Sequence, residues 1–368
     1  MREAWLWRPA DNGAPEESGK GGVGNSAFSD GGSDDDLSAP ESLKGGVVQC
    51  LLCRQFCRLE PGAWGWCGVR VNQDGTLYTI VDDQVAALNL DPVEKKPLYH
   101  FLPGTTTYSL GTQGCNLHCK FCQNHDLAHS IKQDHILRGR PANPVSLVHG
   151  AKAVGAASIS YTYSEPTIFF ELMRPTAKLA VEEGLKNIMV SNGYQSRHCL
   201  KALDGLIHAV NFDLKAFSNR FYEQLCGARL SPVLDTLREA VNMGWWVEVT
   251  TLLIPGENDS PDELQNLAEF IAKDLGRQVP WHISRYHPAY QLTNPVTPLE
   301  TLEMAARIGK EAGLDYVYVG NAPSPEWNDT RCPACNEVII ARQGYRIKMC
   351  GRGLTCPACG VKAAGVEE

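Results

Sequence analysis

Three cysteines stand close together in the stretch GTQGCNLHCKFCQNHD, residues 111–126, and no further cysteine follows until position 199. The three are Cys115, Cys119 and Cys122. Their C-x3-C-x2-C spacing supplies three thiolates, one fewer than a closed tetrahedral zinc or iron–sulfur site requires. A [4Fe-4S] cluster held by three thiolates leaves one iron open, and an open iron binds a small molecule. The spacing therefore indicates metal chemistry at an open coordination position.

A single zinc ion is the alternative for these three cysteines. Its fourth ligand would have to come from a neighbouring side chain such as His118 or His125. We favour the cluster because the cysteines follow directly after the first strand in a series of alternating strands and helices. That is the structural context in which such a cluster motif occurs.

A second group of cysteines lies near the end of the chain, in RCPACNEVIIARQGYRIKMCGRGLTCPACG. It consists of Cys332, Cys335, Cys356 and Cys359. Two C-x2-C pairs are typical of two knuckles that face one tetrahedral zinc ion, and four thiolates close the site. The pattern predicts a structural zinc ribbon, with Cys350 as a spare or alternative ligand. This segment lacks the basic, aromatic-interleaved face that binding of single-stranded nucleic acid requires.

A third group lies in CLLCRQFCRLEPGAWGWCGVR, near the start of the chain. It consists of Cys50, Cys53, Cys57 and Cys67. Either zinc or an auxiliary iron–sulfur cluster would satisfy four thiolates, and we favour zinc because no open coordination position is evident. The two remaining cysteines, Cys199 and Cys226, stand alone within helical patterns, and we interpret them as buried small hydrophobes.

The composition limits the class of protein. The chain has 368 residues and 14 cysteines, most of them in the three tight groups. Clustered cysteines in a reducing compartment are better explained by metal ligation than by disulfides. The net charge of -8 and the lack of a long Lys/Arg run argue against nucleic-acid binding. Neither a signal-like start nor an apolar stretch of about 18 residues occurs, so we expect a cytoplasmic protein without a membrane span.

Short apolar runs alternate with helical patterns from about Tyr108 onward. This repetition predicts an α/β fold in which crossover helices join the strands of a parallel sheet. Six or seven units without a dinucleotide-binding glycine fingerprint favour a partial (βα)6-type barrel over a doubly wound sheet. In barrels the chemistry takes place on the loops that follow the strands. The polar residues predicted at those places are Cys115, Glu165, Asn192, Asp213, Lys215 and His287.

The predicted organisation has four parts. Residues 1–46 form a leader that we expect to be disordered, because its Gly/Ser/Asp-rich stretch offers too little apolar surface to bury. Residues 47–107 hold the N-terminal four-cysteine metal module and a lead-in. Residues 108–322 form the barrel, and residues 323–368 form the C-terminal zinc ribbon and tail.

The barrel motif resembles that of a known family. With the aromatic Phe121 before the last cysteine, the three central cysteines resemble the signature of radical S-adenosylmethionine (radical SAM) enzymes. The resemblance implies that the open iron chelates the amino and carboxylate groups of the cofactor's methionyl moiety. It implies that an electron from the cluster cleaves the sulfonium to give methionine and a 5′-deoxyadenosyl radical. The protein's share is to position the cofactor, with Phe121 among the contacts, and to exclude water.

The resemblance also assigns roles to residues after the next strands. Glu165 in SYTYSEPT lies where the family binds the cofactor's ammonium group, whereas without the resemblance a Glu at a strand end is more often a salt-bridged rim residue. The segment VSNGY, which contains Ser191 and Asn192, resembles a cofactor-contacting loop of glycyl-radical activating enzymes.

Two further segments resemble cofactor-binding loops of the same enzymes. Asp213 and Lys215 in FDLK share one face of a strand, where a cation would neutralise the cofactor carboxylate. A buried Asp/Lys pair that closes the barrel is the alternative. His287 in SRYHPAY resembles a ribose-side histidine, and a core histidine is its alternative.

The order of all these motifs resembles that of the AmmeMemoRadiSam system radical SAM enzymes, from about Val47 to Gly360. The motifs include EKKPLYHFLPG, the run from Pro232 through LDTL, and YVYVGN. The chain departs from the family in its leader, in NEV after the first ribbon knuckle, and in a shortened end. The resemblance implies an oxidoreductase-like reaction that abstracts hydrogen from an unidentified substrate. It implies as partners an electron donor such as flavodoxin or ferredoxin, and proteins of the AMMECR and Memo types.

Two other functions are compatible with the same residues. An activating enzyme that installs a glycyl radical on another protein, as for pyruvate formate-lyase, shares the barrel motifs. A zinc- and iron–sulfur-bearing binding protein without turnover would need the cysteines but would not cleave S-adenosylmethionine. Cleavage under strong reductant separates this last possibility from the other two.

Overall fold

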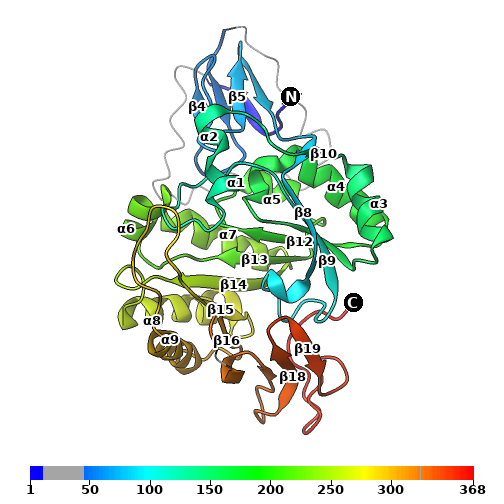
Figure 1. The fold of residues 1–368 in the computed structure, drawn as a ribbon, viewed down its shortest axis with the longest axis vertical. Coiled ribbons are helices and arrows are strands. Elements are labelled where there is room, and N and C mark those ends of the chain that lie inside the picture. Colours follow the sequence, from blue (N-terminus) through cyan, green and yellow to red (C-terminus); the bar gives the residue numbers. More distant parts are fainter. Residues whose placement is uncertain (11–44, 324) are drawn as a thin grey trace.

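The computed structural model describes residues 1–10, 45–323 and 325–368. Three parts follow one another along the long axis (Figure 1): short N-terminal strands, a large sheet with helices, and a small group of C-terminal strands. This is the α/β architecture that the sequence predicts. Most of the predicted leader, residues 11–44, lies outside the described residues. No helix in the described parts of the chain is long and apolar enough to cross a membrane.

An eight-stranded sheet forms the centre, in the order β16-β15-β14-β13-β12-β11-β9-β8. Its strands are β8 (Ala87–Pro92), β9 (Thr106–Gly111), β11 (Ser158–Tyr161), β12 (Lys186–Ser191), β13 (Ala209–Asp213), β14 (Trp246–Leu253), β15 (Trp281–Arg285) and β16 (Val317–Gly320). All neighbouring pairs from β9 to β16 are parallel, and β8 is antiparallel to β9. Because β16 and β8 are separate edges, the sheet is an open, partial barrel.

The central strands of this sheet are buried on both faces, as parallel strands in α/β proteins are, whereas the edge strand β8 is partly exposed. All four residues of β11 are buried, and so are the first four of β13. Polar side chains inside the sheet bond to one another across strands. Thr107 Oγ1 lies 2.7 Å from Ser160 Oγ, and Thr250 Oγ1 donates to Asn211 Oδ1 at 2.8 Å. These bonds satisfy groups that would otherwise be costly to bury.

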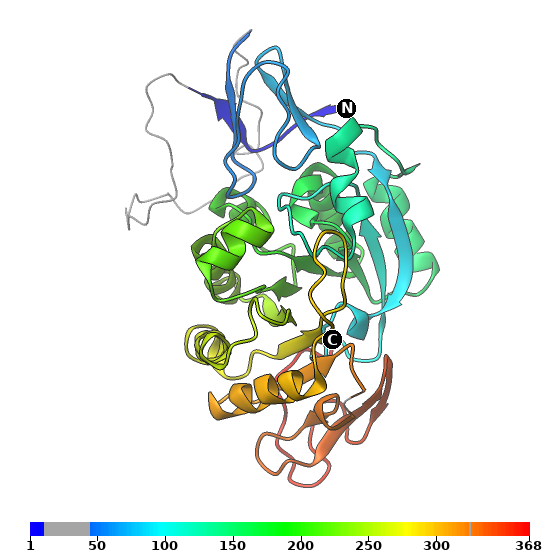
Figure 2. The same cartoon turned by 60° about the vertical axis from the view of Figure 1, so that its left-hand side comes forward.

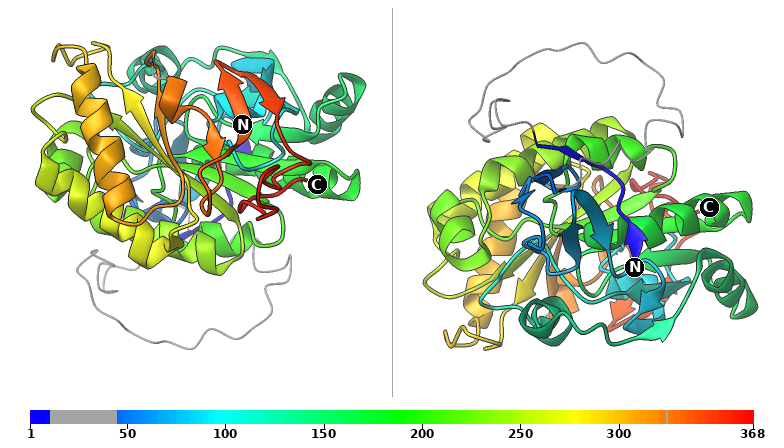
Figure 3. Two further views of the ribbon diagram at one scale, coloured as in Figure 1. Left: turned by 90° about the horizontal axis from the view of Figure 1, so that it is seen from below. Right: turned by 90° about the horizontal axis from the view of Figure 1, so that it is seen from above.

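Crossover helices join the strands and lie along one face of the curved sheet (Figures 2 and 3). They are α3 (Pro144–Ala153), α4 (Phe170–Glu182), α5 (Arg197–Ala202), α7 (Leu230–Asn242), α8 (Pro261–Phe270) and α9 (Leu299–Glu311). Three of them begin at side chains that accept a backbone N–H bond, namely Asn143, Ser196 and Ser260. Consecutive helices pack side by side, which leaves the carboxyl ends of the strands free for loops.

Shorter helical segments complete these loops. They are η2 (Val93–Lys95), α1 (His125–His129), α2 (Ile131–Asp134), η3 (Pro166–Phe169), α6 (Asn219–Phe221), η4 (Tyr222–Cys226), η5 (Ile271–Gly276) and η6 (Pro325–Trp327). Two of them matter for the site: α1 follows the three central cysteines, and η3 begins directly after Glu165.

The N-terminal part consists of short antiparallel strands. They are β1 (Arg2–Glu3), β2 (Trp7–Pro9), β3 (Val48–Cys50), β4 (Arg58–Leu59), β5 (Arg70–Gln73) and β6 (Thr76–Thr79), with β7 (Gln84–Val85) pairing with β10 (Arg140–Pro141). The prediction that residues 1–10 belong to a disordered leader is wrong. Ala4 and Trp7 are buried, and both ends of this segment pair with strands of the cysteine module. The sequence alone does not reveal this pairing because the partner residues lie at least 39 positions away in the chain.

The C-terminal ribbon consists of β17 (Thr330–Arg331), β18 (Val338–Gln343) and β19 (Arg346–Met349). It packs on the segment between η2 and β9. The buried Arg342 guanidinium donates to the Tyr99 carbonyl at 2.8 Å, and His100 Nδ1 lies 2.6 Å from the Ala364 carbonyl. The backbone N–H of Leu102 donates to Val366 O at 2.7 Å. The ribbon and tail are therefore fastened to the barrel by buried polar contacts.

One buried ion pair fastens the N-terminal strands to the barrel. The Arg70 guanidinium on β5 pairs with the Glu171 carboxylate on α4, and both side chains are 1% exposed. The same carboxylate accepts the backbone N–H of Trp5 at 2.7 Å, and the guanidinium donates to Trp5 O at 2.9 Å. The pair thus joins three segments that are distant in sequence.

We expect Glu171→Gln to lower the free energy of unfolding by about 3 to 5 kcal/mol, because it leaves the buried Arg70 charge without its partner. Urea unfolding followed by circular dichroism measures the loss. Glu183→Gln is the matched control, since it breaks the exposed Lys152–Glu183 pair and should cost no more than about 1 kcal/mol. Equal, small losses in both variants would contradict the anchoring role.

Candidate active site

A cavity of about 540 Å³ lies at the carboxyl ends of the parallel strands. The predicted residues that line it are Cys115, Cys119, Phe121, Cys122, Glu165, Ser191, Asn192, Asp213 and Lys215. They reach one place because carboxyl ends of parallel strands share one edge of a sheet. Cys115 and Glu165 each stand four residues beyond a strand, Asn192 follows β12, and Asp213 ends β13. We call Cys115, Cys119 and Cys122 the triad.

The loop that carries the triad is held by backbone contacts on both sides. The N–H groups of His118 and Lys120 donate to the carbonyls of Cys226 and Leu225 in η4, at 2.8 and 2.9 Å. Gly114 has φ +105°, and a Cβ there would lie 2.7 Å from a Val69 methyl group. Only glycine fits this position, which brings the loop against the N-terminal module.

Sulfur in the triad receives hydrogen bonds from the chain. The N–H of Leu117 donates to Cys115 Sγ at 3.4 Å, and Asn192 Nδ2 donates to it at 3.7 Å. Burial raises the pKa of Cys115 to about 12, and the Lys132 ammonium opposes that rise. The thiol of Cys226 bonds to Cys119 and is the main reason why the pKa of Cys119 is lowered. Buried thiols of this kind ionise fully when a metal binds them.

Glu165 is buried, and its carboxylate joins two neighbouring loops. Oε1 accepts hydrogen bonds from Thr167 N at 3.0 Å, Thr167 Oγ1 at 2.6 Å and Ser191 Oγ at 2.9 Å. Oε2 accepts one from Asn192 N at 2.9 Å. Burial raises the pKa of Glu165, and these four donors oppose that rise. Each carboxylate oxygen offers about two acceptor positions, and Oε2 accepts a single bond, so Oε2 keeps room for one further donor.

Asp213 is the last residue of β13 and Lys215 lies two residues beyond it, so the pair does not share one strand as predicted. The two side chains form an ion pair with 3.0 Å between Lys215 Nζ and Asp213 Oδ2. The ammonium also lies 5.9 Å from the ring centre of Phe121. Burial alone would lower the pKa of Lys215, but the Asp213 carboxylate and the Cys119 sulfur raise it. A permanent positive charge therefore stands beside the triad.

His287 is not brought together with the other predicted residues. It follows β15, as the sequence predicts, but its side chain is exposed and does not line the cavity. The loop that carries it leads from Tyr286 toward Tyr290, whose ring stacks on His125 and His129. A role for His287 in binding stays a prediction.

The sequence analysis missed four further residues that line the cavity. They are Lys95, Lys96, Tyr163 and Tyr345. Lys96 Nζ and the Tyr163 hydroxyl both bond to Asp91 Oδ2, at 2.7 and 2.6 Å. Burial lowers the pKa of Lys96 to about 8, although Asp91 opposes this shift. The run EKK in the lead-in was the only available signal, and Tyr345 gave none because its ribbon hairpin is remote in sequence.

The ribbon cysteines meet in a second place. Cys332 and Cys335 lie 3.5 and 3.4 Å from Cys359, and Cys335 lies 3.5 Å from Cys356, measured between sulfurs. A tetrahedral zinc ion with Zn–S bonds of about 2.3 Å holds its sulfurs about 3.8 Å apart. The predicted four-cysteine group is confirmed, and its span fits one metal ion. Cys350 is exposed and stands outside the group.

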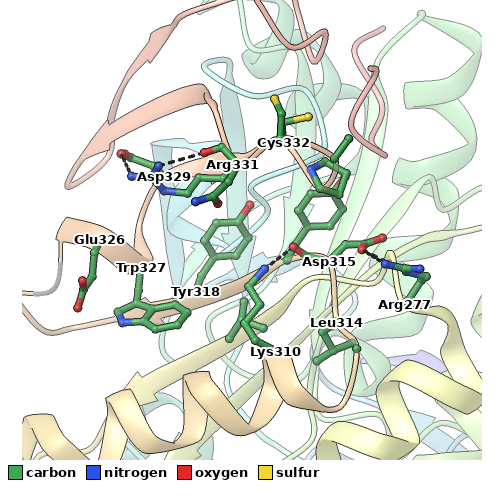
Figure 4. Close-up of a pocket in the computed structure, with 17 residues that line it drawn as sticks. Arg277, Lys310, Leu314, Asp315, Tyr318, Glu326, Trp327, Asp329, Arg331 and Cys332 are labelled. Carbon is green, nitrogen blue, oxygen red and sulfur yellow. Dashed lines mark hydrogen bonds and ion pairs between the residues drawn. The ribbon is translucent and has the colours of Figure 1, made fainter. Parts of the chain in front are cut away.

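A larger cavity of about 990 Å³ lies between α9, β16 and the ribbon (Figure 4). It adjoins the amino ends of β15 and β16, at the opposite edge of the sheet from the triad. Its charged groups satisfy one another: Arg277 Nη2 lies 2.7 Å from the Asp315 carboxylate, and Lys310 Nζ donates to the Asp315 carbonyl at 2.5 Å. We interpret it as a seam between barrel and ribbon.

An open parallel sheet with three cysteines after its first strand defines a class of cluster-binding enzymes, and sequence comparison agrees. Residues 109–271 match the family model of the radical SAM superfamily. An uncharacterized protein of Methanocaldococcus jannaschii is 40% identical over 326 residues, which cover 88% of this chain and 96% of that protein. The chain belongs to the radical SAM superfamily, and it is an enzyme of that superfamily.

Two further similarities were found. A protein of the same archaeon, named provisionally as a glycyl-radical enzyme activating enzyme, is 28% identical over 217 residues, or 57% of this chain and 77% of that protein. The crystal structure of a radical SAM methyltransferase from Sphaerobacter thermophilus superposes with a TM-score of 0.45 at 18% identity, over 60% of this chain and 68% of that one.

We expect Glu165→Gln to weaken binding of S-adenosylmethionine by about 1 to 3 kcal/mol, because the amide nitrogen cannot accept the bonds that hold the two loops. Titration of the anaerobic protein measures the affinity. Thr167→Val, which removes one donor and keeps the carboxylate, is the matched control and should have a smaller effect. An unchanged affinity in Glu165→Gln would contradict the role of this carboxylate.

Proposed function

We propose that the triad holds a [4Fe-4S] cluster and that the enzyme cleaves S-adenosylmethionine reductively to abstract hydrogen from a substrate. The observation that carries the proposal is the cavity itself, which gathers the triad, Glu165, Asn192 and the Asp213–Lys215 pair at one sheet edge. When bound, the cluster supplies one electron that breaks the bond between sulfur and the 5′-carbon of the cofactor.

The residues present fit such a cluster. Among the described parts of the chain, only the ribbon cysteines place three or more ligand atoms within 4.8 Å of one another. The triad is therefore wider than a single ion would hold it, and this favours the cluster over zinc with His118 or His125. The Oγ of Ser164, which lines the cavity, is buried and lacks a hydrogen-bond partner among the described residues, so it is available to a bound group.

The chain's own residues would bind and orient the cofactor. The free position on Glu165 Oε2 and the hydroxyl of Ser164 suit its ammonium group, and Lys215 suits its carboxylate. Asp213 keeps the Lys215 ammonium aimed into the cavity. The ring of Phe121 is 4% exposed and packs beside the triad, which helps to exclude water during radical chemistry. Zinc in the ribbon remains part of the proposal.

The substrate would bind in the same cavity, beside Lys95, Lys96, Tyr163 and Tyr345, which also line it. Transfer of label from an isotopically labelled molecule into 5′-deoxyadenosine would identify the substrate.

We place the enzyme in the AmmeMemoRadiSam system, because the order of its motifs resembles that family from about Val47 to Gly360. On this view it works in the cytoplasm, receives electrons from a flavodoxin or ferredoxin, and acts with proteins of the AMMECR and Memo types. Co-purification of tagged partner proteins tests this part separately from the chemistry.

An activating enzyme for a glycyl-radical protein is the second candidate. It is favoured by the relative that carries this provisional name and is 28% identical over 217 residues. A glycyl radical on a separate polypeptide, seen by electron paramagnetic resonance (EPR), would support it. Label found only in small molecules would count against it.

We expect the anaerobically reconstituted protein to form 5′-deoxyadenosine after reduction, and we expect Cys115→Ala, Cys119→Ala and Cys122→Ala each to abolish it. Each change removes one of three protein ligands, and a cluster short of one ligand is lost or inert. Chromatography and iron content measure the outcome. Cys199→Ala, a buried cysteine outside the cavity, is the control and should keep activity.

Undiminished cleavage in any single triad variant would overturn the proposal. If the reconstituted wild-type protein binds its cluster but forms no 5′-deoxyadenosine, the non-catalytic binding protein is the better description.

A further inference from the structure

The four N-terminal cysteines converge although they come from separate turns. They are Cys50, Cys53, Cys57 and Cys67, and we call them the tetrad. The backbone N–H of Cys50 donates to Cys57 O at 2.9 Å, which closes the loop that carries Cys53. Cys53 lies within electrostatic reach of the other three sulfurs. Three of the four side chains are buried, as ligands of a site enclosed by protein would be.

No three sulfurs of the tetrad lie within 4.8 Å of one another, which is wider spacing than one zinc ion imposes. One zinc ion holds its sulfurs about 3.8 Å apart, and the ribbon sulfurs meet that requirement. In the described residues the ribbon supplies the only set of three or more ligand atoms within 4.8 Å of one another. The tetrad shares this wider spacing with the triad. A cluster in which each thiolate binds a different iron suits both groups.

Donors to sulfur surround the tetrad. The backbone N–H of Trp66 donates to Cys57 Sγ at 3.5 Å, and the buried Arg70 Nη1 donates to Cys50 Sγ at 3.6 Å. Hydrogen bonds to cysteine sulfur are one of the means by which a protein sets the reduction potential of an iron–sulfur cluster. The Arg70 guanidinium also balances part of the thiolate charge.

The loops that carry the tetrad and the triad lie against each other. A Cβ on Gly114, the residue before Cys115, would lie 3.0 Å from the carbonyl oxygen of Cys67. The rings of Trp66 and His118 stack with their centres 4.2 Å apart and their planes 13° from parallel. Trp66 adjoins Cys67, and His118 adjoins Cys119. An aromatic stack therefore connects the two cysteine groups.

We infer that the tetrad holds an auxiliary iron–sulfur cluster that passes one electron to the triad cluster across the Trp66–His118 stack. In this step the tetrad cluster is oxidised by one electron and the triad cluster is reduced by one, and no bond or proton moves. A one-electron donor of the flavodoxin or ferredoxin class restores the tetrad cluster. The assignment of an iron–sulfur cluster to the tetrad does not depend on the proposed function, whereas the electron relay rests on it.

Metal analysis of the anaerobically reconstituted full chain tests the assignment. We expect about eight irons and one zinc per chain, against four irons and two zincs if the tetrad binds zinc. The variant that carries Cys115→Ala, Cys119→Ala and Cys122→Ala should keep about four irons and an EPR signal after reduction. Two zincs in the wild type, or an iron-free triple variant, would overturn the inference. Neither readout requires cleavage of S-adenosylmethionine.

A matched pair of tryptophans tests the relay. Trp66→Leu removes the stack between the two groups, whereas Trp64→Leu removes the Trp64–His135 stack, whose ring centres are 3.8 Å apart in the same module. With S-adenosylmethionine bound, we expect reduced flavodoxin to reduce the triad cluster severalfold more slowly in Trp66→Leu than in the wild type. Freeze-quench EPR measures the rate of this reduction. Trp64→Leu should match the wild type.

Equal rates in the two variants, at equal iron content, would overturn the relay and leave the tetrad cluster as a structural one. If Trp66→Leu loses iron, Trp66→Phe keeps an aromatic ring at that position and serves instead. The triad cluster should be reduced faster in Trp66→Phe than in Trp66→Ala. Equal rates of reduction in these two variants would again overturn the relay.

Discussion

The buried carboxylate of Glu165 is the contact on which the active-site edge depends. It accepts bonds from its own loop after β11 and from the loop after β12, so it fixes both relative to each other. Asn192 then reaches from the second loop to Asn116 Oδ1 at 2.8 Å and to Cys115 Sγ. Burying a carboxylate away from water costs free energy unless hydrogen bonds satisfy its oxygens. Here four hydrogen-bond donors offset that cost. The triad is thereby tied to three successive strand ends.

The N-terminal module completes this edge. Gln55 Nε2 donates to the carbonyls of Asn116 and Gly227, both at 3.0 Å, and Cys53 pairs with Gln195 in an isolated antiparallel bridge. These contacts lie on the same loops that Glu165 and η4 organise. Removal of the module would therefore expose the triad loop, whatever metal the tetrad holds. The Arg70–Glu171 pair is the means by which the module stays in place.

The sequence was sufficient to predict those site residues whose position follows from the order of strands and loops. Cys115, Asn192 and Asp213 were predicted because parallel strands place their following loops at one edge, and that rule needs no tertiary contact. It was insufficient where distant segments meet. Residues 1–10 pair with strands beyond the leader, and the spacing of the tetrad gives ligand identity but not the distance between sulfurs. For His287 the prediction that it follows a strand was correct, but its side chain is exposed.

The matched family segment, residues 109–271, holds the triad, Glu165 and the Asp213–Lys215 pair, to which the proposed function assigns the binding of the cluster and the cofactor. The cavity is also lined by Lys95 and Lys96, which precede that segment, and by Tyr345, which follows it. Arg342, bonded to Tyr99 O at 2.8 Å, holds the ribbon hairpin against the lead-in and so fixes Tyr345 over the cavity. The cavity is therefore lined by three parts of this chain, and the ribbon contributes one of its lining residues although its four cysteines form a group of their own.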